Sequence, residues 1–400
     1  MKVLMLGWEL PPYNSGGLGV ACYQLCKALS KKVDIEFVLP YRHDKEIEFM
    51  KLLAAHPQDV TSVQTSGIAY DSYKYTFADG HEEDLGIFEQ QSLYETAVGQ
   101  LAKYGEYDVI HAHDWLTFRA ALRAKQSSNC PLIVHVHSIE RDRAGGNSGN
   151  PLVREIEYMG LMLADRIIAV SEHTKRCIVE DYDIPSEKIE VVHNSIDIDA
   201  IEPLESTNAY KYLADMKQQG YRVVVNIGRL TVQKGLTNLL LAAKEVVARQ
   251  PKTIFLIVGS GEQYYELIEL AASLGISRNV VFTGFLRGKQ WRDAYAIGDV
   301  FVMPSVSEPF GLTPLEAISY GTPAIISKQS GVNEIIHNCL KVDHWDIDEL
   351  ANKITAVVQN DGLRDELHTN SYQEFMNLSW DTSAEKLNRI YEHQLTGAAA

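Results

Sequence analysis

The chain has 400 residues, and 46% of them are hydrophobic. Single cores stop growing near about 250–300 residues, so this length predicts two or more domains, each with its own core. The formal charge is −16, from 37 basic and 53 acidic residues, which argues against a nucleic acid or an anionic membrane bound through a large basic face.

The five cysteines include no Cys-x-x-Cys pair and lack the density of a disulfide scaffold. This usage predicts a reducing, cytoplasmic compartment. No apolar run approaches the ~20 residues of a membrane span, and the first one, Val3 to Leu6, is too short for a signal peptide. The sequence indicates neither an oligomeric state nor whether the final alanines are native.

Short apolar runs alternate with helical stretches through the first half of the chain. Strands are predicted at 2–8, 33–40, 109–113, 132–137, 166–170 and 189–193, and helices at 19–30, 116–125, 151–163 and 175–180. The strands are nearly continuous apolar runs, which is typical of parallel strands buried on both faces. Residues 41–87 break this rhythm, because they are polar and irregular, and we expect an insertion or a loop-rich edge there.

The alternation of apolar runs and helical stretches resumes after a charged linker at 197–220. Further strands are predicted at 222–227, 253–258, 279–282, 300–303 and 323–327. We therefore predict an α/β fold of two doubly wound Rossmann-like domains, residues 1–198 and 199–378, which face a central cleft. Residues 379–400 form a predicted amphipathic helix that can pack on either domain, and we assign it to the N-terminal one.

The most informative motif is SEPFGLTPLEA at 307–317, between an apolar strand and an apolar helix. A strand, a glycine turn and a helix N-terminus together make a site that receives an anion. Glu308 and Glu316 flank the turn, so we expect a ligand with both phosphate and hydroxyl groups, such as a nucleotide sugar. A solvated helix is the alternative, but Glu308 precedes a proline in the turn and Glu316 lies in an apolar helix start.

Glycine-containing loops follow several other strands. The loop at 228–235 carries Arg229 and Lys234, whose fixed charge suits a diphosphate, with a solvated surface pair as the alternative. The loop at 11–19 has three glycines that allow close backbone approach and positive φ. It is only a partial dinucleotide fingerprint, so a dinucleotide site and a purely structural loop stay open there. The glycine turn at 258–262 is by itself only weak evidence for a ligand site. The loop at 283–287 either lines a flat ring of the ligand or is an ordinary loop.

Histidines gather at the ends of two predicted strands, His111 and His113 on one and His135 and His137 on the next. Together with Asp114 they are compatible with a metal site, and hence with a metal-dependent hydrolase. No spaced third ligand supports that alternative. We favour His111 and His135 as packed, hydrogen-bonded residues, with His113, Asp114 and His137 at the rim of the cleft.

On these motifs the chain resembles the retaining glycosyltransferases of family 4, which have the two-domain GT-B fold. The resemblance covers essentially the whole chain. Its most specific carrier is the Glu-x7-Glu motif from Glu308 to Glu316, combined with Gly228-Arg229 and Lys234. The segments 9–19 and 111–115 resemble the glycogen and starch synthase side of the family.

The resemblance implies roles on the donor side. Arg229 and Lys234 would hold the donor diphosphate and offset charge on the leaving group. Glu308 would bind the hydroxyls of the donor sugar, and Glu316 those of the ribose. The backbone of four further residues would support sugar and phosphate: Phe310, Gly311, Leu312 and Thr313.

Other implied roles lie outside that motif. Gly17 would let its loop approach the diphosphate, and backbone near Arg287 would read the base. The main-chain carbonyl of His137 would sit beside the anomeric carbon, and Asp114 would face the acceptor. The segment 138–150 departs from the usual glycogen synthase pattern, so the acceptor is less well defined than the donor.

We therefore expect a glycosyltransferase that moves a hexose, glucose being first choice, from a UDP-, ADP- or GDP-sugar to a glucan or other sugar acceptor. Retention of anomeric configuration follows from the family. No metal or other cofactor is expected, because arginine, lysine and helix-end N–H groups would stabilise the charge on the departing diphosphate. The absence of an Asp-x-Asp motif near these loops agrees with this expectation. Three alternatives stay open: a nucleotide-sugar epimerase of the same fold, a mannosyl or N-acetylhexosaminyl transferase with another acceptor, and a non-catalytic sugar-binding protein.

Overall fold

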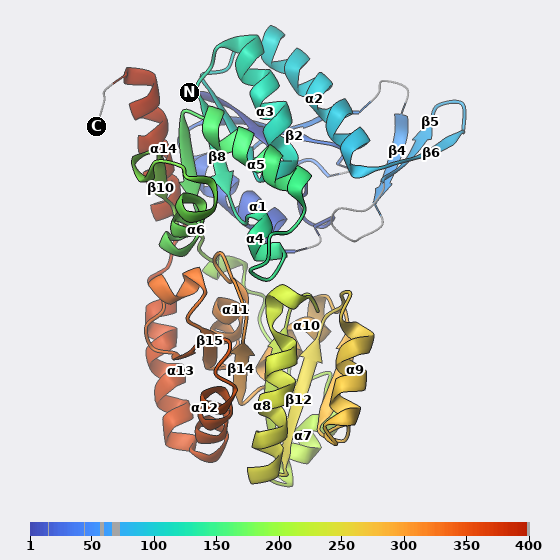
Figure 1. The fold of residues 1–400 in the computed structure, drawn as a ribbon, viewed down its shortest axis with the longest axis vertical. Helices are drawn as coiled ribbons and strands as arrows, with labels where there is room; N and C mark the ends of the chain where they lie inside the picture. The colour runs from blue at the N-terminus through green and yellow to red at the C-terminus, as the bar shows by residue number, and fades with distance from the viewer. Residues whose placement is uncertain (15, 44, 57–59, 66–72, 398–400) are drawn as a thin grey trace. The chain divides into compact units, whose positions relative to one another are not determined.

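The computed structural model describes residues 1–14, 16–43, 45–56, 60–65 and 73–397. They form two compact units (Figure 1). The first unit holds residues 1–140, 150–195 and 379–400, and the second holds 141–149 and 196–378. No helix in the described ranges is both long and apolar enough to cross a bilayer.

The first unit is built on a sheet whose seven described strands all pair in parallel. In spatial order the strands are β10 (Ile189–Val191), β9 (Arg166–Ala169), β8 (Leu132–Val136), β7 (Val109–His113), β1 (Lys2–Leu6), β2 (Asp34–Leu39) and β3 (Lys51–Ala54). The helices of this unit are α1 (Gly17–Leu29), α2 (Ile87–Tyr104), α3 (Trp115–Ser128), α5 (Pro151–Leu163), α6 (Glu172–Tyr182) and α14 (Trp380–Thr396). The short α4 (Glu140–Arg143) begins at the last residue of the first unit's segment 1–140, and its other three residues are assigned to the second unit. The short η1 (Ser186–Lys188) precedes β10.

Each face of this sheet carries its own apolar layer, because successive side chains of a strand point to opposite faces. Val3, Met5 and Val109 face a core that includes residues of α1 and α14. Leu4 and Ile110 face the core formed with α2, α3 and α5. The sheet is therefore covered on both sides, which explains why its strands are almost uninterrupted apolar runs.

The insertion predicted at 41–87 is more regular than expected. It contributes β3 to the main sheet and a separate antiparallel sheet of β4 (Val60–Thr65), β5 (Tyr73–Phe77) and β6 (Glu82–Leu85). The expectation of a loop-rich edge was wrong for these strands. Their sequences are polar and short, so they lack the apolar pattern that identifies a buried strand. Residues 44, 57–59 and 66–72 of this insertion lie outside the described residues.

The second unit repeats the parallel architecture with six described strands. Their order is β13 (Val280–Gly284), β12 (Thr253–Val258), β11 (Arg222–Ile227), β14 (Val300–Met303), β15 (Ala324–Ser327) and β16 (Leu340–Val342). Its helices are α7 (Lys211–Gln218), α8 (Leu236–Arg249), α9 (Tyr264–Ser273), α10 (Gly288–Ala296), α11 (Thr313–Ser319), α12 (Ile347–Gln359) and α13 (Asp361–Phe375). Three short helical turns complete it: η2 (Ile198–Ala200), η3 (Val232–Lys234) and η4 (Gly331–Glu334).

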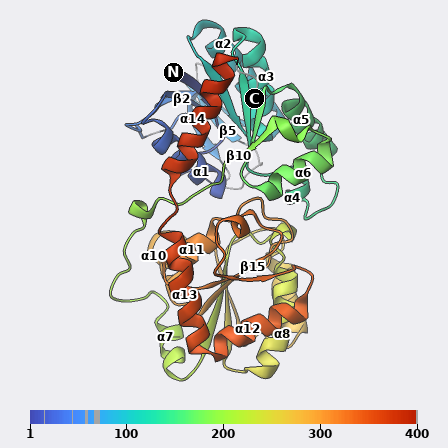
Figure 2. The same cartoon turned by 90° about the vertical axis from the view of Figure 1, so that its left-hand side faces the viewer.

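Helices cover both faces of the second sheet as well. α8 and α12 share one core with residues of β11, β12 and β14, and Figure 2 shows α11 on the other side of the strands from α8. The prediction of two Rossmann-like α/β domains is confirmed. Because neighbouring parallel strands end at the same edge of a sheet, the loops after β11, β14 and β15 are brought together there.

Candidate functional site

The candidate site of the second unit is assembled at this carboxyl edge. β11 leads into Arg229 and then into η3, which ends at Lys234. The neighbouring strand β14 leads into the segment that carries Glu308 and enters α11. Residues separated by 74 positions in sequence thus reach one place because their strands are hydrogen-bonded neighbours.

Lys234 and Glu308 form the centre of this site. The ammonium nitrogen Nζ of Lys234 lies 2.5 Å from Oε2 of Glu308, and Ser305 Oγ donates to the same carboxylate oxygen at 3.1 Å. The Glu308 side chain is only 10% exposed, whereas the Lys234 side chain is 21% exposed. An ammonium has three donors, so this lysine can hold the carboxylate and still reach a second anion from its open side.

Backbone contacts fix the two segments against each other. Gln233 Nε2 donates to the carbonyl of Ser307 at 3.0 Å, and Val306 N donates to the carbonyl of Gln233 at 2.8 Å. Gly235, which begins α8, has φ +66°, and a Cβ there would lie 2.2 Å from the carbonyl oxygen of Pro304. Only glycine allows this approach, so the position of Lys234 depends on its neighbour having no side chain.

The segment from Glu308 to Phe310 is also tied to the loop after β15. Glu308 N donates to the carbonyl of Gln329 at 2.8 Å, and Gly331 N donates to the carbonyl of Glu308 at 3.0 Å. Val332 N donates to the carbonyl of Phe310 at 2.7 Å. Glu308 and Ser330 thus form an isolated parallel bridge, and the main chain of Glu308 is fixed through both its N–H and its carbonyl group.

The turn that follows enters α11. Gly311 has φ +98°, which glycine adopts without strain, and Leu312 precedes the helix without a side-chain cap. No side chain therefore caps the N–H group of Thr313, the first residue of α11. The sequence-predicted combination of a glycine turn and a helix start is present at the predicted residues.

Glu316 lies in the first turn of α11 but faces an aromatic environment. Tyr295 of α10 donates its hydroxyl to Glu316 Oε2 at 2.7 Å, and the Tyr295 and Tyr320 rings are stacked with centroids 6.1 Å apart. Burial raises the pKa of Glu316 to about 7, although the tyrosine hydrogen bond lowers it in part. This carboxyl group is therefore poised between its charged and neutral forms near neutral pH.

The two arginines predicted for the site lie at its outer positions. Arg229 is exposed, and in the described part of the chain it makes no ion pair or hydrogen bond. Arg287 immediately precedes α10, and its guanidinium carbon lies 5.2 Å from the ring centroid of Phe285. The Phe285 ring is 58% exposed, so it presents a flat face to solvent beside this arginine.

In the first unit, four histidines pack together between the sheet and the α1–α14 layer. His111 Nε2 lies 3.3 Å from His135 Nδ1, and His113 Nδ1 lies 2.9 Å from His137 Nε2. Tyr391 of α14 places its hydroxyl 2.6 Å from His111 Nδ1. Burial lowers the pKa of His111 and His137 to about 3, and it lowers the pKa of His113 and His135 well below the ordinary value. The cluster is therefore neutral at physiological pH.

The expectation that His113, Asp114 and His137 lie at the rim of a cleft stays a prediction. Within the first unit, His113 and Asp114 are both buried. His113 Nε2 contacts the sulfur of Met5 at 3.2 Å, because its side chain faces the same layer as His111. The packed and hydrogen-bonded environment expected for His111 and His135 is present, and His137 remains partly exposed.

Asp114 has a defined structural contact. Its Oδ1 accepts hydrogen bonds from the backbone N–H groups of His137, at 2.6 Å, and Ser138, at 3.3 Å. Its φ of +58° is unusual for a residue with a side chain. The carboxylate thus fixes the backbone just after β8, which brings the predicted residues Asp114 and His137 into direct contact.

Some histidine nitrogens and Cys22 Sγ are close enough together to hold a metal ion, as in the groups Cys22–His113–His137 and His111–His113–His135. The nitrogens already hydrogen-bond to one another in pairs, and the His135 and His137 rings are stacked at 4.4 Å. That the protein requires no metal stays a prediction.

The glycine segment near the N-terminus forms a helix start. α1 begins at Gly17, and the backbone N–H of Gly19 donates to Glu9 Oε1 at 3.2 Å. The positive φ that was considered for these glycines is absent at positions 16, 17 and 19, all of which lie in the described residues. Gly17 is exposed, so its predicted approach to a ligand stays a prediction.

Several contact residues were not predicted from the sequence. Tyr295, Ser305 and Gln233 hold site residues in the second unit, and Tyr391 and Met5 contact the histidines. Their types are common and their spacings irregular, so no local motif marks them. Only knowledge of which strands and helices become neighbours in the fold would have identified them.

Comparisons with known proteins agree with this architecture. The family model described as "Glycosyltransferase Family 4" matches residues 15–200, and the one described as "Glycosyl transferases group 1" matches residues 214–374. A D-inositol 3-phosphate glycosyltransferase of Rhodococcus erythropolis is 30% identical over 302 residues, 72% of this chain and 68% of that protein. The chain belongs to this family of glycosyltransferases.

Other relatives span more of the chain. An uncharacterized glycosyltransferase of Methanocaldococcus jannaschii is 28% identical and covers 98% of both chains. A glycogen synthase of Mycobacterium tuberculosis is 28% identical over 84% of this chain and 80% of its own length.

Among solved structures, a sucrose-phosphate synthase of Thermosynechococcus elongatus matches with a TM-score of 0.76 at 19% identity, over 99% of this chain and 100% of its own. An Anabaena protein, HepE, solved with UDP and glucose matches with a TM-score of 0.71 at 19% identity, over 98% and 99%. The fold is therefore GT-B.

Proposed function

We propose that this glycosyltransferase is a metal-independent, retaining enzyme that moves a hexose from a nucleoside-diphosphate sugar to a glucan or related sugar acceptor. Glucose is the first hexose to test, because a glycogen synthase matches most of the chain. The observation that carries the proposal is the contact between Lys234 and Glu308. It joins a fixed cation suited to phosphate with a carboxylate suited to sugar hydroxyls.

The proposed donor would occupy the carboxyl edge of the second sheet. Lys234, together with the exposed Arg229, would bind the diphosphate, and Glu308 would accept hydrogen bonds from the sugar. Glu316 would bind the ribose, and Phe285 with Arg287 would border the base.

The chemistry follows from this charge arrangement. The bond between the anomeric carbon and the phosphate oxygen breaks with its electron pair going to the oxygen, so negative charge develops on the diphosphate. Lys234, Arg229 and the first N–H groups of α11 would stabilise that charge. The acceptor hydroxyl oxygen then bonds to the anomeric carbon on the same face, and its proton passes to the departing phosphate. The roles expected of His137, Asp114 and Gly17 stay predictions.

A first experiment tests the donor. Purified protein is heated with UDP-, ADP- and GDP-glucose, and a true donor should raise the melting temperature, since ligand at 100 times its Kd adds about 2.7 kcal/mol to the free energy of unfolding. The best donor is then incubated with glycogen, and transferred sugar is counted. NMR of the product distinguishes α from β linkage, and therefore retention from inversion. Sugar isomerisation without an acceptor would instead indicate an epimerase.

One alternative acceptor has support from a specific similarity. The relatives that include the Rhodococcus protein are D-inositol 3-phosphate glycosyltransferases, so a polyol phosphate belongs in the same acceptor screen. Transfer to inositol phosphate with none to glycogen would keep the transferase assignment and replace the glucan acceptor.

A further inference from the structure

A shallow groove lies on the outer surface of α8 in the second unit, and neither Lys234 nor Glu308 lines it. Its volume is about 550 Å³. α8 lies between α12 and α9 on one side of the sheet (Figure 1). The groove is lined by residues of α8, by the first turn of α12 with the loop before it, and by Leu274 at the end of α9. Neither the donor roles nor the fold accounts for its composition.

The most unusual residue of the groove is Trp345, whose side chain is 62% exposed. Tryptophan carries the largest apolar surface of any side chain, so leaving it in water costs free energy that burial would recover. Leu241 and Ile347 add apolar surface beside it. An exposed indole over a hollow of this size indicates a surface that accepts a flat, partly apolar ligand.

The loop that carries Trp345 is held in place from several sides. The Asp343 carboxylate accepts from Lys328 Nζ at 2.8 Å and from Gln329 Nε2 at 2.9 Å. The next residue, His344, has its carbonyl bound by Asn238 Nδ2 at 2.7 Å, and its ring packs edge-on against the indole with centroids 4.8 Å apart. The indole is therefore exposed on a fixed loop, and little ordering would be needed when a ligand binds.

Polar groups around the indole are available to a ligand. In the described ranges of the chain, no hydrogen bond or ion pair engages Lys244, Glu245 or Asp348, all of which line the groove. Three carboxylates, counting Asp346, accompany a single lysine, which disfavours a phosphate or other anion. Carboxylates accept hydrogen bonds from hydroxyl groups, and an indole face packs against the C–H face of a ring. A sugar ring presents both surfaces at once.

The groove is also close to the donor residues along one rigid element. Lys234 stands just before α8, and Leu241 follows it by seven residues, which is roughly 10 Å along a helix. Gln329 connects the two places, since its carbonyl accepts from Glu308 N and its side chain donates to Asp343. A polymer that lies on Trp345 would thus be kept within a few sugar units of the donor residues.

We infer that this groove, the Trp345 groove, is a second carbohydrate-binding site that holds a glucan chain during transfer and takes no part in the bond-making step. The inference rests on the proposed function for its choice of a glucan. It predicts that long acceptors are bound more tightly than short ones. It also predicts that this preference depends on Trp345.

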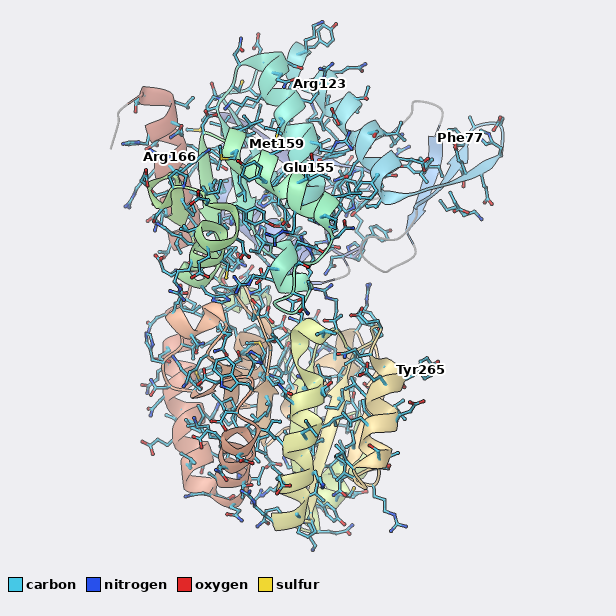
Figure 3. The ribbon with its side chains drawn as sticks, viewed as in Figure 1. Phe77, Arg123, Glu155, Met159, Arg166 and Tyr265 are labelled. Atoms are coloured by element: carbon cyan, nitrogen blue, oxygen red, sulfur yellow. The ribbon has the colours of Figure 1, made fainter. Side chains whose placement is uncertain are left out.

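Native gel electrophoresis tests the binding directly, without any transfer reaction. The full chain is run in gels with and without dissolved glycogen, and we expect glycogen to retard it. Trp345→Ala should lose most of the retardation, corresponding to about a tenfold weaker affinity, while Trp345→Phe keeps part of it. The control is Tyr265→Ala, because Tyr265 is a 78% exposed aromatic residue on α9 that is outside the groove (Figure 3).

Kinetics give the second readout. For Trp345→Ala we expect KM for glycogen to rise about tenfold, with kcat and the KM for a short maltooligosaccharide within twofold of the parent. Thermal unfolding checks that each variant is folded. No retardation of the parent protein by glycogen, or equal retardation of Trp345→Ala, would overturn the inference. Retardation that depends on Trp345 in a protein that transfers no sugar to glycogen would keep the binding site and remove the proposed function, so the two failures are distinguishable.

Discussion

Lys234 Nζ and Glu308 Oε2 are 2.5 Å apart, and each residue comes from the loop after a different strand of the same sheet. The pair keeps a buried carboxylate neutralised and leaves the lysine able to bind a second anion. The Lys234 ammonium therefore contributes both to stability and to the proposed donor binding. Substitutions of Lys234 and Glu308 should separate its two contributions.

Replacing Lys234 by alanine should lower the transfer rate by about 100-fold to 1,000-fold, because the departing diphosphate loses its fixed charge. The free energy of unfolding should fall by about 3 kcal/mol, since the Glu308 carboxylate is left buried without a cation. Urea unfolding and initial rates measure the two effects. Adding Glu308→Gln to Lys234→Ala should recover much of the stability and none of the activity. Near-normal turnover in Lys234→Ala would contradict the donor assignment.

Glu316 should make stability depend on pH in an unusual direction. Its pKa is about 7 in the folded protein against an ordinary value of 4.5, so the folded state keeps a proton that the unfolded state releases. Stability should therefore fall as pH rises from about 4.5 to 7, by up to about 3 kcal/mol for a shift of this size, and by less because the side chain is partly exposed. Urea unfolding from pH 4.5 to 8 should show a flatter profile in Glu316→Gln. The control is Glu269→Gln, an exposed glutamate on α9. If the free energy of unfolding depended on pH in the same way in both variants, Glu316 would not be the cause of the pH dependence.

The histidine cluster should act in the opposite direction at lower pH. His111, His113, His135 and His137 have folded-state pKa values below the ordinary 6.5, so the unfolded chain binds more protons than the folded one. The stability that they confer is present above about pH 6.5 and is lost as pH falls toward about 3, with up to about 1.4 kcal/mol per pH unit for each histidine. Melting temperatures from pH 7 to 4 should fall less steeply in His135→Gln than in the parent. His337→Gln, an exposed control, should keep the parent slope.

Gly235→Ala should damage the site through the backbone. The new Cβ would meet the Pro304 carbonyl oxygen at 2.2 Å in a left-handed conformation, so the loop must move and carry Lys234 with it. We expect a loss of about 2–4 kcal/mol in stability and at least a tenfold loss of transfer. The matched control is Gly80→Ala, because Gly80 has φ +87° but nothing within 4 Å of its Cβ. It should cost only about 1 kcal/mol and leave activity intact, and equal losses in both variants would refute the steric argument.

Tyr391→Phe should test the attachment of α14 to the first unit. The change removes the hydroxyl 2.6 Å from His111 Nδ1 and leaves a buried nitrogen unpartnered, at a cost of about 1–3 kcal/mol. Denaturant unfolding measures the loss, and Tyr104→Phe, on a 79% exposed side chain, serves as the control. A Tyr391→Phe protein as stable as the parent would mean that this hydrogen bond contributes nothing net.

Strands were the part of the fold best predicted from the sequence. β11, β12 and β14 begin and end at the predicted residues, because uninterrupted apolar runs mark strands buried on both faces. β4 to β6 could not be predicted in this way, since β6 reads Glu-Glu-Asp-Leu and owes its conformation to pairing with β5. An apolar run in the sequence indicates a buried strand, and a strand that is mostly exposed has no such run.

In the candidate site, too, only some residues could be predicted from the sequence. Glu308, Lys234 and Glu316 were predictable because strand, glycine turn and helix start follow one another locally. The residues that contact them could not be predicted. Tyr295 reaches Glu316 from a preceding helix, and His113 turned out to be buried because α14 returns to cover its strand. Such contacts form between elements that are distant in sequence, so no local sequence motif marks the residues that make them.

The return of α14 also sets the order in which the molecule can be completed during synthesis. Trp380, Leu387 and Tyr391 of α14 belong to the core of the first unit, yet they leave the ribosome only after every strand of the second. Domains generally fold as units while the chain is made. The second unit can therefore fold first, while the part of the first sheet's apolar face that α14 covers is still exposed. That interval is when the nascent chain should be most exposed to chaperones and to aggregation.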